Sequence, residues 1–119
     1  MNPMVRLRLE HAEQLLGSRR LPGAWPRCVA WLTRLALEQA LDDLWAARAP
    51  SLREAPKRTQ LLALSVVVDE TVQQRATHLW DRLSRAGHHH HYELAPTVGE
   101  LREWLLEVRG LATTLVGSS

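Results

Sequence analysis

Residues 85–97, which read RAGHHHHYELAPT, hold the strongest candidate for chemistry in the chain. Arg85 comes first, four consecutive histidines occupy positions 88 to 91, and Tyr92, the only tyrosine, follows them directly. A histidine side chain can accept and donate protons near neutral pH, and a guanidinium group carries a permanent charge that can bind an anion. Arg82 lies one helical turn before Arg85, so protonation of a single imidazole would make this surface clearly cationic. The stretch therefore indicates a site for an anionic ligand.

The histidine run has two other interpretations. A purification tag is excluded because tags are terminal, whereas this run is internal and a well-formed helix cap follows it. A metal ion could be shared by His88 and His91, which lie three residues apart, with Glu93 as a third ligand. No cysteine lies nearby and no fixed fourth ligand follows, so we expect neither a specific metal site nor a cofactor.

The spacing from Arg85 through His90 to Tyr92 resembles the R-x4-H-x-Y signature of HEPN domains, and of their HepT-like toxin branch in particular. The resemblance extends to the amphipathic segment LALEQALDDLW at residues 35–45 and to the order of the helices, so it covers most of the chain. Members of this branch are small all-helical bundles that act as homodimers. The resemblance implies a metal-independent endoribonuclease, the toxin half of a toxin–antitoxin or defence pair.

The resemblance also implies a role for each residue of the motif. Cleavage of RNA by its own 2′-hydroxyl group requires proton transfer and positive charge on the phosphorane. His90 is implied as the general acid–base group and Arg85 as the group that binds the phosphate, leaving 2′,3′-cyclic phosphate ends. His88, His89 and Arg82 are supporting candidates.

Tyr92 is the expected point of regulation. In HepT-like systems a nucleotidyltransferase antitoxin attaches AMP to this tyrosine, and its bulk and negative charge would keep RNA from the site. A tyrosine with its hydroxyl group in water is the plain alternative. Many members carry a polar residue directly after the arginine, where this chain has Ala86. This difference favours a second function, a catalytically silent HEPN bundle that binds nucleotide, RNA or a protein partner.

A straight helix cannot bring Arg85 and His90 together. At about 100° per residue, five positions leave the two side chains about 140° apart. A bend at Gly87, or a twofold contact between two copies of the chain, could complete the site. Elsewhere, Glu38 and Asp42 lie four residues apart and could orient a site residue, although a solvated helix face is the alternative.

Composition indicates the body that carries this site. The chain has 119 residues, 45% apolar content and few β-branched runs, which predicts one all-α domain spanning residues 1–119. No segment approaches the roughly 18 to 20 apolar residues of a membrane span, and the first residues lack an apolar signal core, so we expect a cytoplasmic protein. The net charge of +2 is compatible with RNA but does not argue for it.

Apolar side chains recur at three- and four-residue intervals in five segments, which predicts five helices. We expect them at residues 3–16, 26–47, 59–66, 69–87 and 98–115. A linker is expected at residues 51–57, and a break around Val67 to Asp69, with Asp69 as a helix cap, is favoured over one long helix. Thr97 and Glu100 predict a capping box before the last helix. The four long helices are expected to form an antiparallel four-helix bundle, with the short additional helix between the second and third.

The second long helix has the clearest apolar pattern. Its buried stripe is expected to consist of Cys28, Trp31, Leu35, Leu41, Leu44 and Trp45. Arg34 and Glu38 have the spacing of an ion pair on the same helix. The five tryptophans are expected mostly as core or interface anchors, because phenylalanine is absent, and the single cysteine excludes a disulfide within the chain.

Overall fold

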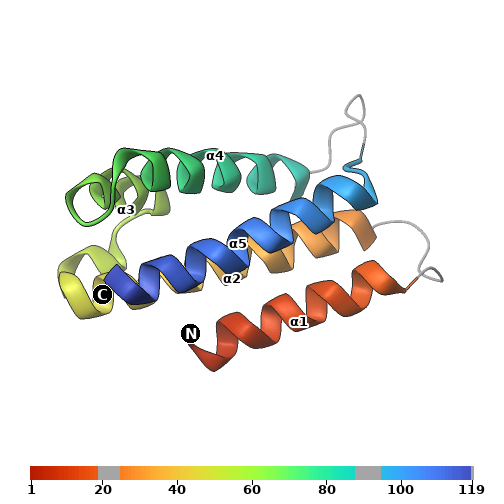
Figure 1. Ribbon diagram of the computed structural model, residues 1–119, viewed down its shortest axis with the longest axis horizontal. Coiled ribbons are helices and arrows are strands. Elements are labelled where there is room, and N and C mark those ends of the chain that lie inside the picture. Colours follow the sequence, from red (N-terminus) through yellow and green to blue (C-terminus); the bar gives the residue numbers. More distant parts are fainter. Residues whose placement is uncertain (19–24, 88–94, 119) are drawn as a thin grey trace.

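The computed structural model describes residues 1–18, 25–87 and 95–118, and these ranges are all-helical, without a strand. Four long helices are present: α1 (Pro3–Gly17), α2 (Trp25–Arg48), α4 (Glu70–Gly87) and α5 (Val98–Ser118). Between α2 and α4 lie the 3₁₀ helix η1 (Pro50–Glu54), the short helix α3 (Lys57–Ala63) and the 3₁₀ helix η2 (Leu64–Val66) (Figure 1). The predicted helices and the break before Asp69 are confirmed.

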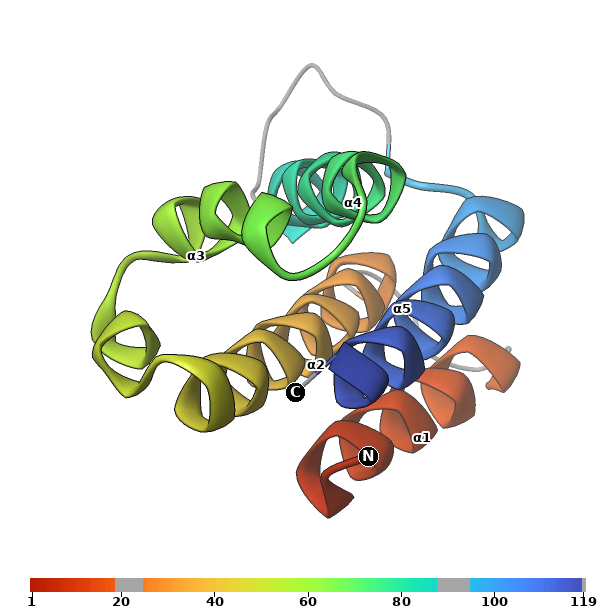
Figure 2. The ribbon, with the colours of Figure 1, turned by 60° about the vertical axis from the view of Figure 1, so that its left-hand side comes forward.

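Helix α2 lies at the centre of the arrangement. It contacts α1, α3, α4 and α5, whereas no contact joins α1 to α4 within the described ranges. Figures 1 and 2 show α1 and α4 on opposite sides of the α2–α5 pair. In chain direction, α1 and α4 run one way and α2 and α5 run the other (Figure 1). Helix α2 is therefore antiparallel to both α1 and α4.

One hydrophobic core joins all five α-helices. It includes Leu9 of α1, Leu41 of α2, Leu61 of α3, Leu79 of α4 and Leu105 of α5, each no more than 2% exposed. Burying one such leucine side chain contributes roughly 1.5–3 kcal/mol relative to leaving it in water. The shared core holds the short helix α3 to the same body as the long helices.

The helix starts follow the predicted capping chemistry. Asp69 Oδ1 accepts a hydrogen bond from Val72 N at 2.9 Å, so Asp69 caps α4 as predicted. Thr97 and Glu100 form the predicted capping box before α5, since each side chain accepts from the other residue's backbone N–H at 3.1 Å. Each cap stabilises its helix by about 1 kcal/mol.

The prediction that Cys28 and Trp31 face the core is wrong. Cys28 is exposed and Trp31 is 49% exposed. The buried face of α2 is instead built near its start from small and β-branched residues, namely Val29, Ala30, Thr33 and Ala36. These residues fill the buried face of α2, and Cys28 and Trp31 lie on the side of the helix that is open to solvent.

The remaining stripe residues follow the predictions more closely. Leu41, Leu44 and Trp45 of α2 are buried, and Leu35 is partly buried. In α5 the buried residues are Leu101, Leu105, Val108, Leu111, Ala112 and Leu115, whereas Val98, which directly follows the cap, is 40% exposed. No helix in the described parts of the chain has both the length and the apolar character needed to cross a bilayer.

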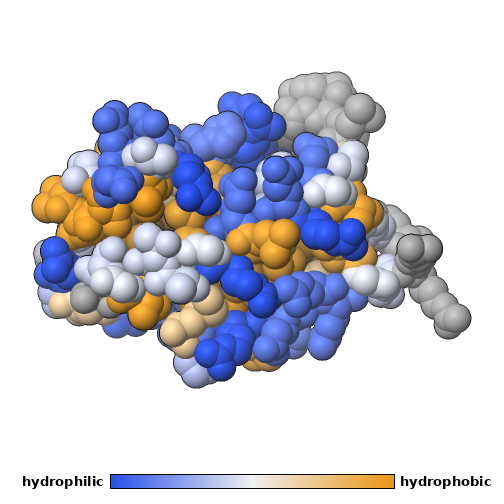
Figure 3. All heavy atoms as spheres, viewed as in Figure 1, coloured by the Kyte–Doolittle hydropathy of each residue, from blue (hydrophilic) through white to orange (hydrophobic). Residues whose placement is uncertain are grey.

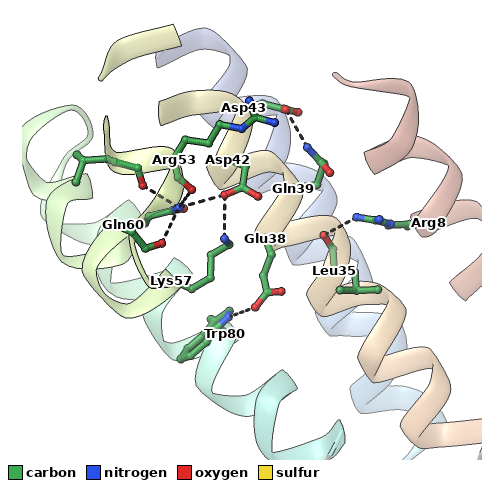
Figure 4. A network of polar contacts seen from close by, with 12 residues as sticks. Arg8, Leu35, Glu38, Gln39, Asp42, Asp43, Arg53, Lys57, Gln60 and Trp80 are labelled. Atoms are coloured by element: carbon green, nitrogen blue, oxygen red, sulfur yellow. Dashed lines mark hydrogen bonds and ion pairs between the residues drawn. The ribbon is translucent and has the colours of Figure 1, made fainter. Parts of the chain in front are cut away.

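Most of η1 lies in the predicted linker at residues 51–57, and Gln60 fixes this turn to the body. Gln60 is fully buried, and its Nε2 lies 3.1 Å from Asp42 Oδ1 (Figure 4). The same nitrogen donates toward the carbonyl oxygens of Leu52, Arg53 and Ala55 at 3.0–3.3 Å. One side-chain amide thus ties the connection after α2 to α2 itself, and sequence reasoning did not identify it.

Apolar side chains gather on the surface at the α3 end of the molecule (Figure 3). Leu62 is 66% exposed and Val66 is 83% exposed. Beside them a groove of about 480 Å³ is lined by Trp45, Leu52 and Val67, among others. This end lies opposite the end at which α4 finishes (Figure 1), so the two ends of the molecule differ in chemistry.

Candidate functional site

The candidate site follows the end of α4. Helix α4 finishes at Gly87, as predicted, directly before the histidine run. The starts of α2 and α5 lie at the same end of the molecule (Figure 1). His88, His89, His90 and Tyr92 lie outside the described residues, so the roles implied for them stay predictions.

Arg82 and Arg85 bring positive charge to this end. Both are exposed, and neither forms an ion pair with another described residue. They lie three residues apart, which places them about 60° apart around α4 and one turn apart along it. The negative end of the helix dipole favours cations in the last turn, but it does not neutralise them. Both guanidinium groups are therefore open to an anionic ligand.

The local fold explains why Arg85 points outward. Leu83 is buried, and Ala86 is partly buried against the core. Arg85 lies about 160° from Leu83 around the helix, so it projects from the opposite side of α4. Position 86, where this chain has Ala86, therefore lies at the edge of the core. The neighbouring Arg85 points toward solvent.

Glu38 is engaged by α4. Its Oε2 accepts a hydrogen bond from Trp80 Nε1 at 2.9 Å, and Figure 4 shows the two side chains pointing toward each other. Arg58 lies over the Trp80 ring, with 5.4 Å from its Cζ to the ring centroid. The expected ion pair between Arg34 and Glu38 is not among those that join described residues, because Trp80 takes the carboxylate instead. Trp80 is a partner that sequence spacing could not identify, since it lies 42 positions from Glu38.

Asp42 is engaged by α3. Its Oδ1 pairs with Lys57 Nζ at 2.9 Å and accepts a hydrogen bond from Gln60 Nε2 at 3.1 Å. The alternative of a solvated helix face is wrong for both acids, because each carboxylate binds a side chain of another helix. Their proposed role in orienting Arg85 or His90 stays a prediction. Within the described ranges they hold α2 to α3 and α4.

The other histidines outside the run lie on the surface. His11 of α1 and His78 of α4 are both exposed. Over the described ranges no three His, Cys, Asp or Glu side chains come together in the way a metal ion would require. The histidine run lies beyond those ranges, so the metal interpretation of His88 and His91 stays open.

The fold and the described part of the site define an all-helical protein with unpaired arginines at the end of α4. Comparison with known proteins gives no further assignment, because no family model, no curated protein and no solved structure matches this chain. Its function is therefore inferred from its own residues.

Proposed function

We propose that this protein is a metal-independent endoribonuclease of the HEPN type. The supporting observation is that the guanidinium groups of Arg82 and Arg85 are exposed at the end of α4, directly before the histidine run, and form no ion pair with another described residue. Arginine binds a phosphate through a planar fork of donors, and histidine can move the proton of the 2′-hydroxyl group. Arg85 would stabilise the phosphorane, and His90 would act as the general acid–base group.

We further propose that the protein acts as a homodimer and that modification of Tyr92 regulates it. The four long helices would form an antiparallel bundle of the HEPN type, and two copies would meet so that their sites face each other. A nucleotidyltransferase antitoxin would attach AMP to Tyr92 and block the site by charge and bulk. The protein would then be the toxin of a cytoplasmic toxin–antitoxin or defence pair.

A second function is favoured by one specific observation. Ala86 is partly buried against the core where many HEPN nucleases carry a polar group beside the arginine. A chain without that group could bind nucleotide, RNA or a protein partner through Arg82 and Arg85 and cleave nothing. RNA cleavage by the purified protein separates the two functions.

Cleavage of a single-stranded RNA in the presence of EDTA is the expected result of this test. The fragments should end in 2′,3′-cyclic phosphate, as mass spectrometry would detect, because the attacking group is the adjacent 2′-hydroxyl. DNA of the same sequence is the matched control, and it should stay intact because it lacks that hydroxyl group. Intact RNA would favour the silent bundle, and cleavage that stops in EDTA would contradict a metal-independent reaction.

A further inference from the structure

One hydrogen bond shows how α2 and α4 are aligned along the line where the two helices meet, which we call the seam. Trp80 Nε1 donates to Glu38 Oε2 at 2.9 Å, and the two helices run antiparallel (Figures 1 and 4). Four residues back along α2 lies Arg34, and four residues forward along α4 lies Ser84. Each step covers roughly 6 Å in the same direction along the seam. Arg34 and Ser84 therefore lie at the same level of the seam.

Both residues hold a buried polar atom without a hydrogen-bond partner. Arg34 Nε and Ser84 Oγ are shielded from solvent, and neither has a hydrogen-bond partner among the described residues. Glu38, which has the right spacing to pair with Arg34, bonds to Trp80 instead. Folded proteins rarely leave such groups unpaired, because removing them from water without a partner is costly. A ligand that brings its own acceptor atoms would relieve that cost.

The surroundings of the seam carry positive charge. Arg27 lies two turns before Arg34 on the same side of α2, and α4 ends in the exposed Arg85. The nearest acid along α4 is Asp81, which pairs with Arg58 at 3.4 Å. Arg34 forms no ion pair with another described residue, and the carboxylate of Glu38, one turn away, bonds to Trp80, so an anion would be a complementary ligand for the Arg34 guanidinium group.

An aromatic face lies beside Arg34. Trp31 precedes it by three residues, or about 4.5 Å along the helix. Glu38 marks the side of α2 that faces α4, and Trp31, seven residues earlier, lies within about 20° of that side. Trp31 is 49% exposed, so part of its indole ring is open to solvent. An open indole next to a cation suits a ligand that combines an aromatic base with a negative charge.

We propose that Arg34, Ser84 and Trp31 form a nucleotide subsite on the seam between α2 and α4. Arg34 and Ser84 would bind the phosphate, because guanidinium and hydroxyl groups donate to phosphate oxygens. Trp31 would stack on the attached base, which any base permits. The subsite uses none of the residues assigned to RNA cleavage, so it stands without that activity. The ligand of the subsite would be either a free mononucleotide or one nucleotide within a single-stranded RNA.

Binding measured by calorimetry tests the subsite with two probes. One is AMP, and the other is a short 2′-O-methyl oligoribonucleotide, which cannot be cleaved because it has no free 2′-hydroxyl group. Arg34→Met removes the charge but keeps a long apolar side chain, and it should weaken binding about tenfold or more. Trp31→Leu should weaken it about tenfold. The matched control is Arg6→Met, which removes the same charge from an exposed position on α1, and it should change affinity less than about twofold.

The outcomes separate the possible ligands. An Arg34-dependent loss with AMP assigns the subsite to free nucleotides, and a loss with the oligonucleotide alone assigns it to a strand. Equal effects of Arg34→Met and Arg6→Met, or no effect of Arg34→Met on either probe, overturn the proposal. Arg34→Met should also leave the melting temperature unchanged or raise it, because it replaces an unpaired, partly buried cation. A clear fall in melting temperature would make Arg34 a structural residue and would also overturn the proposal.

Discussion

RNA cleavage is expected to fall by at least about 100-fold when Arg85 or His90 is replaced by alanine. General acid–base catalysis by a positioned side chain contributes roughly 10²–10⁴-fold to a rate, and His90 is the group proposed for this role. Removing a preorganised charge from the developing oxyanion costs about 10²–10³-fold, and Arg85 is the group proposed to supply that charge. Initial rates on a labelled RNA, with EDTA present, measure both losses.

A control on the same helix makes this prediction specific. Arg75→Ala removes the same charge from another exposed position of α4, ten residues before Arg85, and it should reduce the rate only slightly. Because Arg85 is exposed and unpaired within the described ranges, Arg85→Ala should change the free energy of unfolding by no more than about 0.5 kcal/mol. Wild-type rates in Arg85→Ala and His90→Ala would remove both residues from the site.

Gln60→Glu is expected to destabilise the protein by about 3–5 kcal/mol at neutral pH. In the native protein Gln60 Nε2 donates toward Asp42 Oδ1 and three backbone carbonyl oxygens. A glutamate there would direct a carboxylate at four acceptors inside a fully buried site, and an uncompensated buried charge costs this much. Chemical denaturation followed by circular dichroism gives the free energy of unfolding.

Two further variants separate charge from loss of hydrogen bonds. Gln60→Leu removes the donor without adding charge, and it should cost less, about 1–3 kcal/mol. Gln14→Glu makes the same chemical change at an exposed position of α1, and it should stay within about 0.5 kcal/mol of the wild type. If Gln60→Glu unfolded at the same denaturant concentration as Gln14→Glu, Gln60 would not hold the connection after α2.

The long helices could be predicted from the sequence because their signals are local. Apolar spacing located α1, α2, α4 and α5 within a few residues, and the carboxylate of Asp69 and the hydroxyl group of Thr97 marked two helix starts through contacts three residues away. The exposed face of α2 could not be predicted in the same way. Apolarity alone predicts that Trp31 is buried, whereas the buried face of α2 near its start consists of Val29, Ala30, Thr33 and Ala36, and Trp31 is 49% exposed.

The partners of the polar residues could not be predicted because they lie far along the chain. The spacing of Glu38 and Asp42 correctly placed the two carboxylates on one side of α2. Glu38 binds Trp80, which lies 42 positions away, and Asp42 binds Lys57, which lies 15 positions away. No local sequence pattern predicts contacts over such separations. The burial of Gln60 could not be predicted, because a lone glutamine between a threonine and a leucine is typical of an exposed helix position.

A double-variant measurement tests the central claim most directly, namely that Arg85 and His90 act on one and the same phosphate. Groups that work as a unit give losses that are far from additive. We therefore predict that the protein carrying both Arg85→Ala and His90→Ala cleaves RNA no more slowly than the slower of the two single variants. A double variant whose loss equals the product of the two single losses would contradict the account, because the two side chains would then act independently.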